Sequence, residues 1–63
     1  MEYKIKESRE KVGMSQEQLS KASNVSRAII SGLENGSITV TTTKTLSKIA
    51  EALGLKVSDI FLS

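Results

Sequence analysis

Two apolar residues and one serine stand at helical spacing near the N-terminal end of the chain. In the stretch from Tyr3 to Val12, the positions Ile5, Ser8 and Val12 lie three and four residues apart, so they would share one face of a helix. Gly13 follows directly and predicts the end of this helix. We therefore expect a first helix in this stretch, with these three positions facing the core.

The stretch from residue 15 to residue 23 predicts a second helix. Ser15 is a good N-cap, and Gln18, three residues later, would complete a capping box. Leu19 and Ala22 then fall on one face at helical spacing. This helix would have a defined start and one narrow apolar stripe.

A third helix is predicted from residue 26 to residue 35, directly after the turn signal Ser23-Asn24. Ser26 can cap its start, Ile30 and Leu33 share one face, and Gly36 predicts its end. Two short helices this close together, each with one apolar stripe, are typical of a helix-turn-helix.

The C-terminal part of the chain begins with a stretch that lacks helical periodicity. Residues 37–42, S-I-T-V-T-T, favour a strand locally, but we expect an extended loop because no second strand is predicted to pair with it. Thr42 or Thr43 would cap a fourth helix that runs to Leu53, and a short fifth helix is expected from about Val57 to Leu62. The apolar stripe of the fourth helix consists of Leu46, Ile49, Ala50 and Leu53.

Several sequence blocks in the right order resemble the phage-repressor/Cro-like helix-turn-helix family. They are S-Q-E-Q-L-S, N-V-S-R and G-L-E-N-G, followed at residues 45–61 by T-L-S-K-I-A-E-A-L-G-L-K-V-S-D-I-F. The resemblance covers about Ile5 to Phe61. It implies an all-α fold, a compact five-helix bundle whose second and third helices form the motif, with residues 1–63 as one DNA-binding domain. The implied function is a sequence-specific regulator of double-stranded DNA, a repressor that acts as a homodimer on a two-fold operator.

The resemblance also implies which residues contact DNA. The positions that match base-contacting residues are Ser26, Arg27, Ala28 and Gly32. Those that match backbone-contacting residues are Gln16, Ser31, Asn35, Ser37, Thr42, Thr43 and Lys44. Arg27 is the strongest candidate, because its guanidinium can donate to both acceptors of a guanine. Such a bidentate contact favours guanine over the other bases by roughly 1–3 kcal/mol. The alternative for Arg27 is a contact with phosphate or solvent only, and the alternative for Gly32 is a packing need.

Two further sets of residues match structural positions of the family. Arg9 and Glu34 would form an ion pair that joins the first helix to the end of the recognition helix. The residues expected at the dimer interface are Leu55, Lys56, Val57, Ile60 and Leu62, whereas Phe61 is expected in the core.

Composition excludes several classes of function. The 63 residues include no cysteine and no histidine, so disulfides, thiolate metal sites and histidine bases are impossible, and we expect neither an enzyme nor a cofactor or metal. No apolar run is long enough to span a membrane, and the expected setting is a reducing cytoplasm, which the family resemblance implies is bacterial. The net charge of +2 is only mildly basic. A protein-interaction module built on the same bundle stays open as the alternative, and weak salt dependence of binding would favour it.

Overall fold

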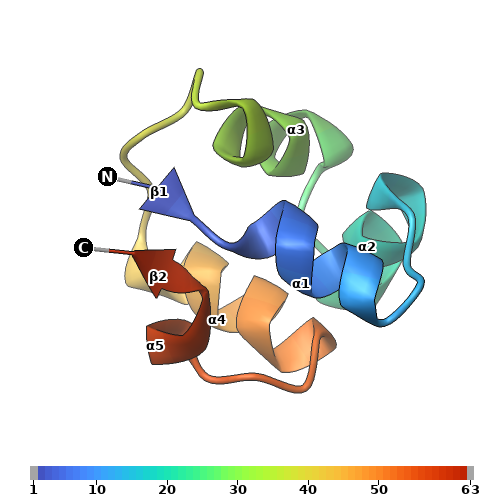
Figure 1. The fold of residues 1–63 in the computed structure, drawn as a ribbon. Coiled ribbons are helices and arrows are strands. Elements are labelled where there is room, and N and C mark those ends of the chain that lie inside the picture. The colour runs from blue at the N-terminus through green and yellow to red at the C-terminus, as the bar shows by residue number, and fades with distance from the viewer. Residues whose placement is uncertain (1, 63) are drawn as a thin grey trace.

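Five short helices form the described part of the chain, residues 2–62, in the computed structural model (Figure 1). Side chains are described from residue 3 to residue 60. The helices are α1 (Ile5–Lys11), α2 (Gln16–Ser23), α3 (Arg27–Asn35), α4 (Thr43–Ala52) and α5 (Val57–Ile60). The predicted all-α fold, with its five helices, is confirmed.

The two ends of the chain lie side by side, which local patterns did not predict (Figure 1). Strand β1 (Glu2–Tyr3) pairs antiparallel with strand β2 (Phe61–Leu62), and the Lys4 N–H donates to the Ile60 carbonyl at 2.7 Å. The predictions that Tyr3 begins the first helix and that Leu62 ends the last are therefore wrong. A pairing between opposite ends of a chain leaves no signal in local periodicity, which detects only near neighbours.

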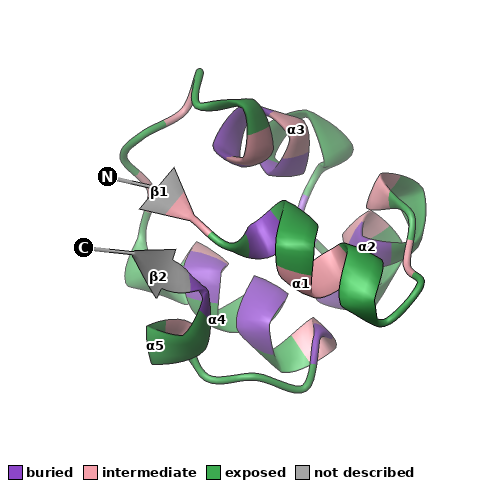
Figure 2. Ribbon diagram, viewed as in Figure 1, coloured by how far each residue is buried: buried purple, intermediate pink, exposed green. Residues whose placement is uncertain are grey.

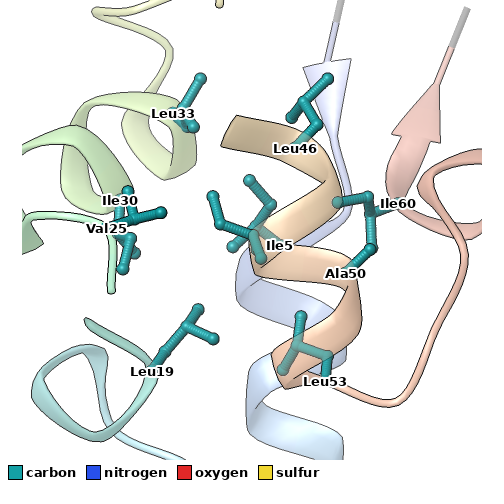
Figure 3. Packing of buried hydrophobic residues seen from close by; sticks show 10 residues of the cluster. Ile5, Leu19, Val25, Ile30, Leu33, Leu46, Ala50, Leu53 and Ile60 are labelled. Carbon is teal, nitrogen blue, oxygen red and sulfur yellow. The ribbon is translucent and has the colours of Figure 1, made fainter. Parts of the chain in front are cut away.

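The core lies between the helices, and every helix contributes to it (Figures 2 and 3). Its buried apolar residues are Ile5, Leu19, Val25, Ile30, Leu33, Leu46, Ile49, Ala50, Leu53 and Ile60. Figure 3 shows Ile5 of α1 beside α4, with Ile30 and Leu33 of α3 pointing toward them from the other side. The predicted stripes of α3 and α4 are therefore buried as expected.

Two predicted inward positions point to solvent instead. Val12 is 57% exposed, because α1 ends at Lys11 and Val12 is only its C-cap. Ala22 is exposed, and its neighbour Ser23 is buried in its place. The Ser23 hydroxyl donates to the Leu19 carbonyl at 2.7 Å, so this buried polar group has the partner it needs.

Side-chain caps set the starts of the central helices as predicted. Ser15 accepts from the Gln18 N–H at 3.0 Å, and the Ser15 N–H donates to the Gln18 Oε1 at 2.8 Å, which completes the capping box of α2. Ser26 caps α3 by accepting from the Ile29 N–H, and Thr42 caps α4 by accepting from the Thr45 N–H. Between α2 and α3, Asn24 adopts a left-handed conformation with φ 60°, which turns the chain sharply.

Candidate nucleic-acid interface

The N-terminal end of α3 exposes side chains on its outer side. Ile30 and Leu33 face the core, while Arg27, Ala28 and Asn35 are exposed. Amphipathic helices place one face in the core and leave the opposite face to solvent. The outer face of α3 is therefore available to contact another molecule at residues 27–29 and at Asn35 (Figure 2).

The first residues of α2 and α3 lie together at this end. The Arg27 Nε donates to the Gln16 Oε1 at 3.4 Å, a long and exposed hydrogen bond. The Gln16 Nε2 donates in turn to the Glu34 Oε1 at 3.0 Å. Because an amide has one acceptor oxygen and one donor nitrogen, the bond to Glu34 leaves the Gln16 oxygen facing Arg27.

Arg9 and Glu34 form a two-pronged ion pair between α1 and α3. The Arg9 Nε lies 2.9 Å from the Glu34 Oε2, and the Arg9 Nη2 lies 3.0 Å from the Glu34 Oε1. Only 11% of the Arg9 side chain and 4% of the Glu34 side chain are exposed. Arg9 also donates from Nη1 to the Met14 carbonyl at 2.8 Å, so it holds the turn before α2 as well. One guanidinium thus links α1, the turn before α2 and the end of α3.

The ion pair shifts the titration of both partners. Burial raises the pKa of Glu34, but hydrogen bonds from Arg9 and Gln16 and the charges of Arg9 and Lys6 outweigh it, so the pKa lies below its usual value. The hydrogen bond to Glu34 raises the pKa of Arg9. Both partners are therefore charged at neutral pH.

A shallow polar hollow of about 270 Å³ lies over this cluster. It is lined by Lys6, Arg9, Gln16, Ser31, Glu34 and Asn35. Three of the predicted backbone-contacting residues, Gln16, Ser31 and Asn35, are thereby brought to one place. The Glu34 carboxylate neutralises the charge of Arg9 at this hollow, so Lys6 supplies its net positive charge, which attracts phosphate.

Gly32 does not lie open on the outer face as its predicted role requires. It is buried, and a Cβ built on it would come within 2.6 Å of the Ile38 Cγ1. The prediction that Gly32 meets a base edge is therefore wrong for this structure, and the packing alternative explains the glycine. Its backbone carbonyl accepts from the Ile38 N–H at 2.9 Å.

The loop after α3 and the start of α4 contain the remaining predicted contacts. The Asn35 Oδ1 accepts from the Ser37 N–H at 2.9 Å, so it shapes the turn after α3. The Thr42 hydroxyl accepts from the Thr45 N–H at 3.1 Å and is used for capping. Thr43 and Lys44 are exposed in the first turn of α4. The free N–H groups of such a turn and a lysine beside them suit a phosphate.

A family model described as helix-turn-helix matches residues 5–60 of this sequence, nearly its whole length. The chain belongs to the Cro/C1-type helix-turn-helix family. The resemblance expected from the sequence is thus confirmed, and this helix-turn-helix protein is a DNA-binding regulator. A search of curated proteins finds no match. In residues 2–62, no helix is both long and apolar enough to cross a membrane.

The predicted dimer residues of this helix-turn-helix protein are only partly accessible. Leu55 is 37% exposed, Lys56 is exposed and Val57 is half-buried. Ile60 is completely buried against α4 near Ala50, as Figure 3 shows, so its predicted place on a dimer surface is wrong. The side chains of Leu62 and Phe61 lie outside the described residues.

Sequence patterns did not identify two residues that shape the outer side of the helix-turn-helix. The Tyr3 hydroxyl donates to the Thr39 carbonyl at 3.1 Å and connects β1 to the loop after α3. Ile38, in the same loop, lies against Gly32 of α3. A glycine inside a helix is a weak sign of close approach by another group, and it does not say which group approaches.

Proposed function

We propose that this protein is a sequence-specific repressor that inserts the N-terminal end of α3 into the major groove of double-stranded DNA. The observation that supports this most is the exposed pair Arg27 and Ala28 at the start of α3, next to a buried ion pair that holds the helix. The major groove is wide enough for one helix and displays a distinct pattern for each base pair.

Arg27 is the residue that selects a base. Its only described side-chain hydrogen bond is the 3.4 Å contact with Gln16, which leaves most of its five donors for a ligand. A guanine accepts two of these donors in a fixed geometry. Gln16 keeps one amide hydrogen beyond its bond to Glu34, and that hydrogen suits a phosphate oxygen next to the groove.

The other exposed polar residues position the protein on the DNA backbone. Ser31 and Asn35 border the polar hollow beside α3, and Ser37 follows in the loop. Thr43 and Lys44 would meet the phosphates from the start of α4. Contacts with phosphate set register and orientation but carry no sequence information, so these residues contribute affinity rather than selectivity.

Two copies of the chain would occupy a two-fold operator. One α3 contacts only a few base pairs, and pairing half-sites about one helical turn apart raises both affinity and specificity. The surface around Leu55, Lys56 and Val57 is the part of the predicted interface that is accessible in this structure. A dimer on a promoter operator, in a bacterial cytoplasm, would repress by excluding polymerase.

Selection of bound sites from a random duplex pool tests this function. Wild-type protein should enrich a two-fold symmetric consensus, and its affinity should fall steeply with salt as phosphate contacts release counterions. Arg27→Ala should relax the preference at one base position in each half-site, a loss of roughly 1–3 kcal/mol for that base.

Gln16→Ala serves as the matched comparison, because it changes the neighbouring side chain on α2. It should weaken binding to all sequences about equally. If the pool yields no consensus and binding ignores salt, DNA is not the ligand. If both variants bind like the wild type, α3 does not dock in this way.

A further inference from the structure

One position on the outer face of α3 is covered by a residue from outside the helix. Ala28, Gly32 and Asn35 are spaced four and three residues apart, so they share one side of the helix. Ala28 and Asn35 are exposed, yet Gly32 between them is buried. A glycine on a solvent-facing helix side is buried only if another segment lies across it.

That segment is the loop after α3, and Ile38 makes the contact. Gly36 has φ 85° and reverses the chain, and the Ile38 N–H then donates to the Gly32 carbonyl at 2.9 Å. A Cβ at position 32 would lie 2.6 Å from the Ile38 Cγ1 and 3.3 Å from its Cβ. Real Cβ atoms do not approach a neighbour so closely, so the Ile38 side chain fills the space that a side chain at position 32 would take.

The covering residue is itself held on both sides. Ile38 packs against the core cluster, and the next residue, Thr39, accepts from the Tyr3 hydroxyl at 3.1 Å. Ile38 is only half-buried, and its side chain lies against α3 at Gly32. Ile29, at the start of the same helix, is also partly exposed and apolar.

We propose that Ile38 is a specificity-determining residue that contacts a thymine methyl group in place of the missing side chain at position 32. This inference rests on the proposed function, since it requires α3 to lie in the major groove. An isoleucine side chain has no hydrogen-bond donor or acceptor. The feature of the major-groove edge that it can distinguish is therefore the C5-methyl group of thymine.

Exchange of thymine for deoxyuridine tests the contact directly, because it removes that methyl group alone. Each thymine of the selected operator is replaced in turn, and the affinity of wild-type protein and of Ile38→Ala is measured for every duplex. For wild-type protein, one thymine in each half-site should cost about four-fold in affinity when its methyl group is lost. For Ile38→Ala, the same exchange should cost nothing.

Val40→Ala is the matched control, because Val40 is an exposed apolar residue in the same loop. At every thymine, the exchange for deoxyuridine should lower the affinity of Val40→Ala as much as that of the wild type. Ile38→Val removes a single methyl group, keeps the loop packed, and should show an intermediate cost at the same thymine. This variant tests the contact even if Ile38→Ala loosens the loop.

The outcomes separate the two proposals. Suppose that wild-type protein selects an operator, but each thymine-to-deoxyuridine exchange lowers the affinity of Ile38→Ala and Ile38→Val as much as that of the wild type. Ile38 then contacts no thymine methyl group. That result overturns this inference and leaves the proposed function standing. If the wild-type protein selects no duplex, the inference is overturned together with the proposed function.

Discussion

The two sides of this molecule are built from different kinds of contact. On the side where α1, α2 and α3 meet, directed hydrogen bonds link Arg9, Glu34, Gln16 and Met14. On the side where α1 faces α4 and α5, a groove of about 320 Å³ contains the apolar side chains of Val12, Leu53 and Leu55 among charged and polar ones. Its lining is Lys4, Glu7, Ser8, Lys11, Val12, Leu53, Leu55 and Asp59.

The difference fits the roles proposed for the two sides. A helix that reads bases must be held at a fixed angle, because a bidentate contact tolerates little misplacement, and directed bonds supply that. Apolar contacts have no direction, so a surface built from them can adapt to a partner copy. The comparison therefore predicts that changes on the first side alter the orientation of α3, whereas changes on the second side alter assembly only.

The largest expected effect comes from breaking the buried ion pair. Arg9→Leu leaves the Glu34 carboxylate buried without its guanidinium, and we expect the free energy of unfolding to fall by about 3 kcal/mol. Lys21→Leu is the matched control, since Lys21 lies 3.7 Å from Glu17 in an exposed pair. It should change stability by less than about 0.5 kcal/mol. Urea denaturation measures both, and equal losses would contradict a special role for the buried pair.

The sequence predicted those features of the structure that depend on residues close together in the chain. The capping box at Ser15, the cap at Ser26 and the α4 stripe are signals within a few residues, and the structure contains all three. The β1–β2 pairing depends on segments far apart in the chain. So does the burial of Ile60, because its environment is decided by α4 rather than by its neighbours.

The features of the candidate site also differ in whether the sequence could predict them. The pair Arg9 and Glu34 could be placed from the family resemblance, because the family fixes both positions. The cover over Gly32 depends on the path of residues 37–42 after Gly36, which no local pattern of Thr and Val residues describes. The hydrogen bond from Gln16 to Glu34 likewise needs two helix ends to meet in space.

Low pH should lower the stability of the protein, because protonation of Glu34 removes its ion pair with Arg9. The folded state holds the pKa of Glu34 below its usual value, so its contribution to stability is present at neutral pH and is lost as pH falls through the lowered pKa. The comparison is with Glu34→Gln, whose amide cannot ionise. The difference in unfolding free energy between the wild-type protein and Glu34→Gln should shrink below about pH 4, near the usual pKa of a glutamate. A gap that stays constant down to pH 2.5 would contradict this linkage.

The smallest expected effect lies on the groove side and concerns assembly. Leu55→Gln should leave folding and binding to a single half-site near wild type, because Leu55 is partly exposed and distant in sequence from the residues proposed to contact DNA. It should weaken binding to the two-fold operator about ten-fold, through loss of apolar contact between the two copies. Val12→Gln makes the same apolar-to-amide change on the α1 side of the same groove and should behave like the wild type. Gel-shift titrations on one and two half-sites separate these results.

Equal weakening of operator binding by Leu55→Gln and Val12→Gln would mean that the dimer interface spans the whole groove. No weakening by Leu55→Gln would mean that this surface is not part of the dimer, and the proposed docking of α3 would be unaffected.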